Sequence, residues 1–474
     1  MTARAAMAVV TVVVVAAGCA VGPNYRRPEL PAPATYRDEG PDAASIADLP
    51  WFEVFRDEGL RRLVDEALTG NRDLLAAAER VEQARALAAV QRGELFPQVG
   101  YDAETHHEKD ALFGVPASRT GVSTTSVYML NAAWELDVWG RIRRASEAAK
   151  AGLLANDAVR RGIVLSLVTG VAQAWFELRE LDLELAITRR TVESFRATRD
   201  LFGRQFRGGV TSRLDVLRAD AALSQAAASV PDLERRIAVK ENELSVLLGR
   251  PAGAIERGSS PDRIVPAPGV PAGIPSQLLE RRPDLLEAEH RLHAETARIG
   301  ESFAGFFPRI GLTAVAGDAS SDLENVLNGS GFWSLGANAG GPILSFGRTW
   351  YGWRAAEARA RAATRDYEQT VLEALRDVSN ALVARGKLAE VRVEQQRAVE
   401  ALTEALRIAR IRYVGGLATY LEVLDAQQQL FPAELDLART ERDQLIAVVA
   451  LYRALGGGWK QAPEAPTVPL PLRP

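Results

Sequence analysis

The chain has 474 residues, of which 47% are hydrophobic and 25% are charged, and its formal net charge is −4 at pH 7. This length exceeds that of one ordinary domain, and the charge gives no reason to expect a nucleic-acid partner. The single cysteine, Cys19, excludes a disulfide or a thiolate metal site within one chain.

The first eighteen residues have the parts of a signal peptide. A start with Arg4 as its only charge precedes a largely apolar run over 7–17, which ends in small residues directly before Cys19. Such a run is too short to cross a bilayer core of about 30 Å at about 1.5 Å per residue. We predict that residues 1–18 are a signal peptide and that 19–50 form an extended N-terminal segment. An ordinary secretory signal with an incidental cysteine is the alternative.

The body of the chain carries an internal duplication. The run Asp73–Leu75 leading to Phe96-Pro97 recurs as Asp284–Leu286 leading to Phe307-Pro308, at an offset of 211. Later motifs recur at an offset of 207: Trp139-Gly140-Arg141 with Phe346-Gly347-Arg348, Gly208-Gly209 with Gly415-Gly416, and Leu248-Gly249 with Leu455-Gly456. We therefore predict two copies of one structural unit, at 51–250 and 276–458. A linker at 251–275 joins them, and the Pro-rich tail at 459–474 is predicted to be disordered.

Each half contains two segments in which apolar and polar residues alternate. The apolar positions begin at Val99, Tyr128, Ile310 and Trp333, and the alternation in the second segment continues to Val138. This pattern predicts strands with one apolar face, as in a transmembrane barrel with a wet lumen. A soluble, half-buried sheet is the alternative. Four strands are too few to close a barrel, so the membrane interpretation predicts an oligomer.

The remaining segments are predicted to be long helices. Residues 140–208 and 347–415 lack proline and are rich in Ala, Leu, Arg and Glu, which corresponds to roughly 100 Å of helix each. After each Gly-Gly pair a shorter helix returns, and another short helix precedes each Phe-Pro pair. We expect a coiled-coil wall in which each continuous helix packs against two stacked half-length helices.

Together these motifs resemble the TolC-like outer-membrane efflux proteins, in their NodT/OprM-like lipoprotein branch. The resemblance extends from Cys19 to about Trp459 and rests on the segments 19–28, 282–285 with 307–308, 346–348, 413–416 and 421–426. It implies a mixed α+β membrane protein: a homotrimer with a twelve-stranded outer-membrane β-barrel continued by a twelve-helix periplasmic tunnel. It also implies lipidation of Cys19, and docking to a periplasmic adaptor and a proton-driven inner-membrane transporter.

The acidic pair Glu422 and Asp425 lies three residues apart, on one face of a helix just beyond the second Gly-Gly pair. The resemblance places this pair, with Tyr413 nearby, around a closed periplasmic aperture, where carboxylates would favour cations. A solvated acidic helix face is the alternative. The corresponding pair in the first half is Asp215 and Arg218.

The tip glycines, Gly208, Gly209, Gly415 and Gly416, are expected to adopt left-handed turn geometry. Their role in adaptor docking is implied by the resemblance. We expect His290 and His293 to be solvated rather than to bind a metal.

No motif for catalysis or nucleotide binding stands out, so we expect no enzyme, no cofactor and no metal site. The leading functional hypothesis is a passive exit duct for small molecules in a tripartite efflux pump. The outlet of a one-step protein secretion system and a non-conducting lipid-anchored scaffold are the alternatives.

Overall fold

The computed structural model describes residues 20–29, 51–55, 57–109, 122–257, 278–321 and 330–457. The predicted signal peptide, Cys19, the Pro-rich tail and most of the N-terminal segment and the linker lie outside these residues. The chain divides into two compact units, one built from 1–29, 80–157 and 287–368, the other from 30–79, 158–286 and 369–474. Each unit takes residues from both halves of the duplication.

The elements follow the same order in each half. The first half contains α2 (Trp51–Phe55), α3 (Glu58–Gly70), α4 (Arg72–Gly93), β1 (Gln98–Lys109), β2 (Val122–Leu136), α5 (Arg141–Arg207) and α6 (Arg213–Leu247). The second contains α7 (Leu278–Arg281), α8 (Pro283–Ala304), β3 (Arg309–Ser320), β4 (Ser330–Gly340), α9 (Arg348–Val414) and α10 (Tyr420–Ala454). The long helices α5 and α9 each have 67 residues, and the returning helices α6 and α10 each have 35, so the predicted equality of the halves is confirmed.

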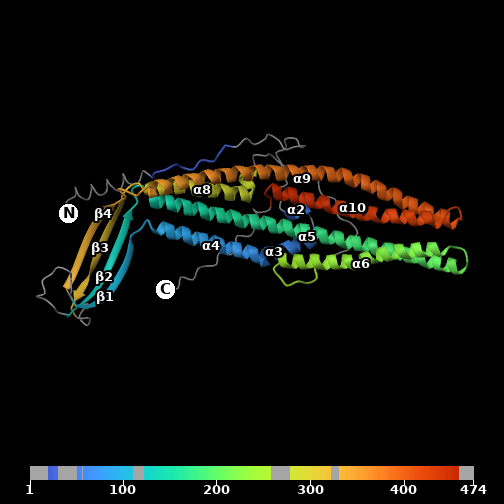
Figure 1. Ribbon diagram of the computed structural model, residues 1–474, viewed down its shortest axis with the longest axis horizontal. Helices are drawn as coiled ribbons and strands as arrows, with labels where there is room; N and C mark the ends of the chain where they lie inside the picture. Colours follow the sequence, from blue (N-terminus) through green and yellow to red (C-terminus); the bar gives the residue numbers. More distant parts are fainter. Residues whose placement is uncertain are drawn as a thin grey trace. The chain divides into compact units, whose positions relative to one another are not determined.

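The first unit contains a single antiparallel sheet in the order β1-β2-β3-β4 (Figure 1). Its register places Tyr101 opposite Leu130, Leu130 opposite Ala316, and Ala316 opposite Trp333, so the apolar residues of all four strands share one face. All four predicted strands are confirmed. β1 and β4 are the edges of this sheet, and each pairs with one strand only among the described residues.

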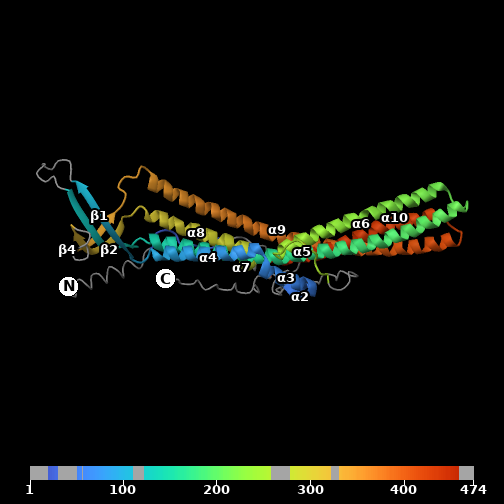
Figure 2. The same cartoon turned by 90° about the horizontal axis from the view of Figure 1, so that it is seen from below.

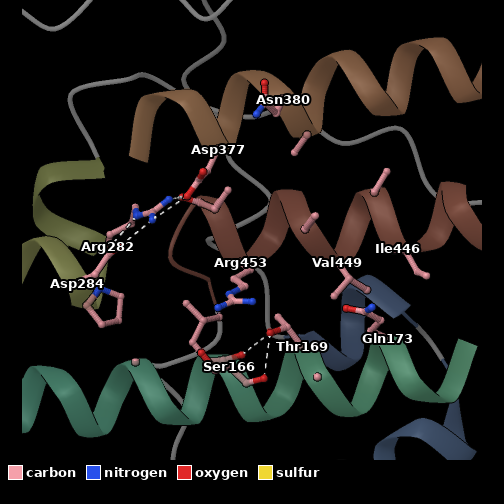
Figure 3. Close-up of a pocket in the computed structure, with 18 of the residues that line it drawn as sticks. Ser166, Thr169, Gln173, Arg282, Asp284, Asp377, Asn380, Ile446, Val449 and Arg453 are labelled. Carbon is pink, nitrogen blue, oxygen red and sulfur yellow. Dashed lines mark hydrogen bonds and ion pairs between the residues drawn. The ribbon is translucent and has the colours of Figure 1, made fainter. Parts of the chain in front are cut away.

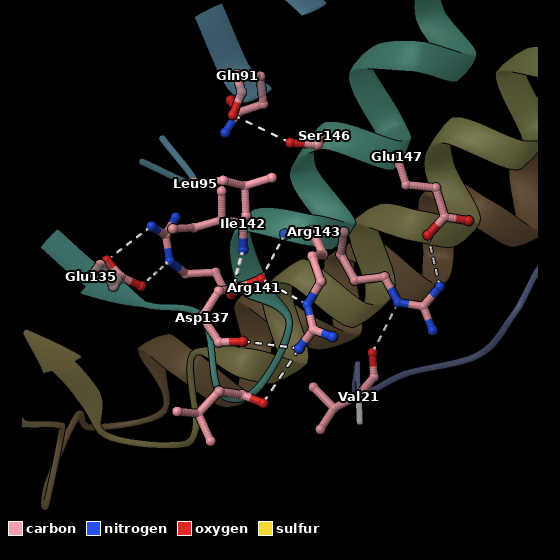
Figure 4. A network of polar contacts seen from close by, with 12 residues as sticks. Val21, Gln91, Leu95, Glu135, Asp137, Arg141, Ile142, Arg143, Ser146 and Glu147 are labelled. Atoms are coloured by element: carbon pink, nitrogen blue, oxygen red, sulfur yellow. Dashed lines mark hydrogen bonds and ion pairs between the residues drawn. The ribbon is translucent and has the colours of Figure 1, made fainter. Parts of the chain in front are cut away.

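The end of β2 differs from the prediction, because Asp137 and Val138 belong to a turn. The Asp137 carboxylate accepts hydrogen bonds from the backbone N–H groups of Ile142 and Arg143, both at 2.9 Å, and so caps α5 (Figure 4). Arg143 also donates to this carboxylate, at 3.1 Å. Asp137 therefore caps α5, and β2 ends one residue before it, at Leu136.

Residues 20–29 are bound to the same unit by backbone and side-chain contacts. The Val21 N–H donates to the Trp139 carbonyl at 3.0 Å, and Arg144 donates to the Val21 carbonyl at 3.1 Å. Gly22, with φ +95°, lies so close to Gly300 that a Cβ atom would come within 2.4 Å of its Cα. This contact explains why glycine is needed at both positions.

Further along the segment, the Tyr25 ring stacks on the His293 ring with centroids 4.7 Å apart. The Arg27 guanidinium makes a bidentate contact with Glu289, at 2.9 and 2.7 Å. His293 is therefore only partly solvated: its side chain is 31% exposed, and its Nε2 also lies 2.9 Å from a carboxylate oxygen of Glu147. The N-terminal segment thus connects α5 of the first half with α8 of the second.

The second unit contains α6, α10, the part of α5 from residue 158 and the part of α9 from residue 369, which form two helical hairpins, each closed by a short turn (Figure 2). Val192 and Phe195 of α5 pack with Ala222 and Ala226 of α6 and with Leu424 of α10 in one buried cluster. No helix within the described ranges is both long enough and apolar enough to cross a membrane.

Two equivalent joints in this unit connect helix ends. At the first, the Asn71 side chain donates to the Leu247 carbonyl at the end of α6, at 2.9 Å, and accepts from an N–H at the start of α4. At the second, the guanidinium of Arg282 donates to the Ala454 carbonyl at the end of α10, at 2.8 Å. Asn71 and Arg282 occupy matching positions of the duplication, so the predicted stacking of half-length helices has a specific hydrogen bond at each joint.

Candidate functional site

The two tip turns have the same backbone geometry. At the end of α5 the Gly209 N–H bonds the Phe206 carbonyl, and the Val210 N–H bonds the Gln205 carbonyl, which is the Schellman arrangement. At the end of α9, the N–H groups of Gly416 and Leu417 bond the carbonyls of Tyr413 and Arg412 in the same way. The repeat therefore extends to individual backbone hydrogen bonds.

The prediction of left-handed geometry for the tip glycines is correct for two of the four. Gly209 has φ +74° and Gly416 has φ +70°, whereas Gly208 and Gly415 do not have positive φ. The N–H groups of Gly208 and Gly415 bond carbonyls four residues earlier, so both residues still continue a helix. The left-handed residue is needed only once per turn, at the position after the last helical residue.

The first turns of the two returning helices are capped differently. In α6 the Ser212 hydroxyl accepts from the Asp215 N–H at 3.2 Å, and the Asp215 carboxylate accepts from the Ser212 N–H at 3.3 Å, forming a capping box. In α10 the corresponding Thr419 makes no cap bond with its side chain. Hydrogen bonding from the Ser212 hydroxyl lowers the pKa of Asp215, and the nearby charge of Arg218 lowers it further. Asp215 is therefore held by its own helix.

The acidic pair lies on one face of α10, as the spacing predicts, and this face is exposed. Glu422 and Asp425 are exposed, whereas Val423 and Leu424 between them are buried. A carboxylate oxygen of Glu422 lies 3.5 Å from the Arg412 guanidinium, which belongs to the other helix of the hairpin. Asp425 accepts a hydrogen bond from Gln429 one turn further along, at 2.8 Å. The sequence-based interpretation missed the cationic partner Arg412.

Aromatic and polar contacts connect the two hairpins near the tips. The Gln205 amide on α5 donates to the Tyr413 hydroxyl on α9, at 2.7 Å. The Tyr413 ring meets the Tyr420 ring edge to face, with centroids 4.9 Å apart, and Tyr420 meets Phe202 of α5 in the same manner, at 4.5 Å. The Tyr420 hydroxyl hydrogen-bonds the Thr198 hydroxyl. Tyr413 thus belongs to an aromatic cluster that ties α5 to both helices of the second hairpin.

A second polar contact lies deeper between the hairpins. The amide of Gln427 donates to the Ser194 hydroxyl at 2.7 Å, and Arg410 donates to the same oxygen at 2.9 Å. Burial raises the pKa of the Tyr420 hydroxyl. The sequence did not predict these contacts. The only sequence signal for them is a polar residue, Gln427, within an otherwise apolar helix face.

Large apolar side chains are exposed around both turns. We call the following set the tip patch: Val210, Leu214, Leu217, Val414, Leu417 and Leu421. A contiguous exposed apolar surface is typical of an interaction site. Each hairpin contributes three of these residues, and two pairs occupy matching positions of the duplication: Val210 with Leu417 and Leu214 with Leu421.

A cavity of about 720 Å³ adjoins the second helix joint, between α5, α9 and α10 (Figure 3). Its charged lining consists of Arg282, Asp284, Asp377 and Arg453, and small residues such as Ala381 provide the space. Burial disfavours the Arg282 cation, but Asp284 and Asp377 outweigh this effect and raise its pKa. Arg282 donates to Asp284 at 3.0 and 2.7 Å and lies 3.3 Å from Asp377. This pairing makes Arg282 a structural residue of the joint.

Two carboxylates are buried next to each other on α5. The side chains of Glu180 and Glu184 are each 1% exposed. Glu184 contacts Arg439 at 2.6 Å and Arg236 at 3.2 Å, whereas Glu180 lies 3.5 Å from Arg442 and beside Glu184. Burial raises the pKa of Glu180 to about 7, and the charge of Glu184 adds to the effect. We call these five residues the buried acid cluster.

Comparison with known proteins connects this architecture to one family. The model of the family described as outer membrane efflux protein matches residues 63–250 and 274–457, which are the two halves of the duplication. The chain is 36% identical over 450 residues to the solvent efflux pump outer membrane protein SrpC of Pseudomonas putida, covering 93% of this chain and 96% of that protein. It is 32% identical over 446 residues to the cation efflux system protein CusC of Escherichia coli K12, with coverages of 93% and 96%.

Solved structures give the same result. The open state of the MtrE outer membrane channel of Neisseria gonorrhoeae superposes with a TM-score of 0.84 at 31% identity, covering 93% of this chain and 99% of that one. The outer-membrane channel OprN superposes with a TM-score of 0.85 at 34% identity, covering 93% and 100%. The resemblance inferred from the motifs is thereby confirmed. This chain belongs to the outer membrane efflux protein family, and it is an efflux protein of the outer membrane.

Proposed function

We propose that this protein is the exit duct of a tripartite efflux pump, formed by three copies. The observation that carries the proposal is the sheet: four strands with one common apolar face, and only one neighbour for each of β1 and β4 within the described chain. Barrels close with about eight strands or more, so several copies must contribute. Three copies would give twelve strands in the outer membrane and a twelve-helix periplasmic tunnel. The relatives are efflux proteins, which supports a role in transport rather than catalysis.

The aperture of the duct is proposed to lie at the helical tips. Glu422 and Asp425 would supply its carboxylates, with Tyr413 fixing the second hairpin against α5. Asp215 and Arg218 would lie at the matching level of the first hairpin, where Asp215 is occupied by its capping box. The ion pair of Arg412 with Glu422 would reduce the negative charge of the ring. The carboxylates would favour cations at the mouth.

The tip patch and the turns at Gly208-Gly209 and Gly415-Gly416 are proposed to dock a periplasmic adaptor protein. The exposed apolar side chains of the patch support this, since such a surface is costly to leave in water. The adaptor would connect the duct to a proton-driven inner-membrane transporter. Acylation of Cys19 is proposed to anchor the protein in the outer membrane lipid, next to residues 20–29.

The names of the relatives suggest the cargo. SrpC is named for solvents and CusC for cations, so small molecules are the proposed substrates. These names favour efflux over the outlet of a protein secretion system, and the one-sided apolar sheet argues against a scaffold without a pore.

Conductance of the purified protein in planar lipid bilayers tests this function. We expect single-channel steps and a reversal potential that indicates cation preference in a salt gradient. The double variant Glu422→Gln with Asp425→Asn should move the reversal potential towards zero, because the mouth loses its fixed charge. Glu58→Gln, at an exposed position of α3, is the matched control and should leave it unchanged.

Two results would contradict the proposal at different levels. A stable oligomer that never conducts, with or without the tip substitutions, would exclude the duct. Conductance with an unaltered reversal potential in the double variant would retain the duct and exclude the proposed ring of carboxylates.

A further inference from the structure

We infer that the cavity beside the second helix joint binds a small organic anion with an apolar body, such as an aromatic sulfonate or carboxylate, whose acidic group pairs with Arg453. This inference goes beyond the proposed exit duct, because it assigns the chain a ligand site in the helical wall, away from the tips. The cavity has a volume of about 720 Å³, and all of its lining residues belong to the second unit. Pockets of this size hold drug-sized molecules.

The charges that line the cavity leave one cation without a partner among the described residues. The Asp284 carboxylate accepts two hydrogen bonds from Arg282, and the Asp377 carboxylate lies 3.3 Å from Arg282 and 2.7 Å from Arg376. Both acids of the lining are thus paired. Arg453 also lines the cavity, and its guanidinium has no ion pair and no hydrogen bond within the part of the chain that the structure describes. The potential in the cavity therefore favours an anion.

The fold does not require a cation at this position. The residue that matches Arg453 in the first half is Val246, which is 70% exposed at the end of α6. Both returning helices nevertheless end alike, since Gly249 and Gly456 follow them with φ of +76° and +73°. Arg453 lies in the last turn of α10, where a positive charge also favours the helix dipole. That effect contributes to stability and needs no ligand, so a measurement of affinity separates the two roles.

A glycine helps to keep the cavity open. Gly170 lies in the interior of α5 and lines the cavity, and a Cβ atom added to it would have no neighbour within 4 Å. Packing therefore does not require glycine there, although glycine weakens the interior of a helix relative to alanine. A large side chain at this position would instead occupy the space that a ligand needs.

The remaining lining suits a molecule that is apolar except for one acidic group. Leu165 of α5 and Ile446 and Val449 of α10 provide apolar surface. Figure 3 shows the Arg453 side chain between α10 and α5, within the same cavity. An aromatic body can cover the aliphatic side chains while its sulfonate or carboxylate accepts charge-assisted hydrogen bonds from the guanidinium.

Calorimetric titration of the full-length protein in lipid nanodiscs tests the inference. The probe is naphthalene-1-sulfonate, the neutral comparison is naphthalene-1-sulfonamide, and empty nanodiscs give the background. We expect one saturable site per chain for the sulfonate. Arg453→Val introduces the residue type of the matching position and should weaken sulfonate binding by about tenfold or more, because a charge-assisted contact is lost, while sulfonamide binding stays nearly unchanged. Arg196→Val, at an exposed position of α5, is the matched control and should bind like the parent.

A second variant tests the location of the site. Gly170→Leu fills the cavity and favours the helical state of α5, so it should abolish binding of both probes without loss of folding. Circular dichroism and thermal unfolding show whether each variant is folded. If Gly170→Leu does not fold, Ala384→Leu, on the α9 side of the cavity, takes its place.

Three results would overturn the inference. The first is the absence of saturable sulfonate binding to the parent protein. The second is an equal loss of both probes in Arg453→Val, which would assign this residue to the shape of the wall instead of to an anion. The third is undiminished binding in the folded variant with a filled cavity. Conductance recorded on the same preparation decides the proposed duct separately, so a protein that conducts but does not bind the sulfonate refutes the ligand site alone.

Discussion

Removing the charge of one buried carboxylate should change how the stability of this protein depends on pH. Burial raises the pKa of Glu180 from its ordinary value of 4.5 to about 7. The folded chain therefore holds a proton on this group over a pH range in which the unfolded chain has already released it. Stability from this group is fully present below about pH 4.5 and is lost as pH rises through about 7.

The size of the effect follows from the shift. Each pKa unit corresponds to about 1.4 kcal/mol, so the loss between about pH 5 and pH 8 is on the order of 3 kcal/mol. Glu180→Gln keeps the shape of the protonated side chain and its ability to donate a hydrogen bond to Glu184. The variant should thus lack this part of the pH dependence and be the more stable protein at about pH 8.

The measurement is urea unfolding of the detergent-solubilised protein, followed by far-UV circular dichroism at several pH values. Protein concentration is held constant, because the stability of an oligomer depends on it. Glu193→Gln, at an exposed position of the same helix, is the matched control and should retain the pH dependence of the parent. Parallel curves for Glu180→Gln and the parent would refute the reasoning and mean that Arg442 keeps Glu180 ionised.

Five further substitutions test the turns and one of the joints by thermal unfolding. Gly416→Ala should destabilise by about 1 kcal/mol because φ is +70°, whereas Gly415→Ala should be neutral or stabilising; equal losses would contradict this assignment. Ser212→Ala should cost about 1 kcal/mol through the lost capping box, and Thr419→Ala clearly less, so a reversed order would refute the difference in capping. Asn71→Ala removes the hydrogen bond at the first joint and should lower the melting temperature by a few degrees, about 1 kcal/mol. An unchanged melting temperature would show that packing alone holds that joint.

Most of the secondary structure could be predicted from the sequence, because the internal duplication places matching motifs at the ends of corresponding helices and strands. The matching motifs predicted both long helices to within a residue at each end, since Gly140 and Gly347 directly precede them and Gly208 and Gly415 directly follow them. The alternation predicted all four strands. β2 ended early because a carboxylate within the alternating run, Asp137, caps the next helix, and the period-two pattern cannot distinguish these roles.

The candidate site could be predicted only in part. The exposed face of Glu422 and Asp425 followed from helical spacing, but their neighbours depend on packing between helices far apart in the sequence. The contact of Gln205 with Tyr413 joins the two halves of the chain and leaves no local pattern. The buried acid cluster was not predicted either. In the sequence, Glu180 and Glu184 look like ordinary solvent-exposed carboxylates, and their burial depends on packing against α6 and α10.

The unequal caps at Ser212 and Thr419 show that two repeats within one chain can differ in sequence at matching positions. In an assembly built from single repeats, any substitution would appear in every hairpin at once, so a change useful at one position would be imposed on all. Here Ser212 has a capping box, whereas the matching residue is a threonine without one. A mutation thus reaches only half of the hairpins, and selection can adjust one set while the other preserves the wall.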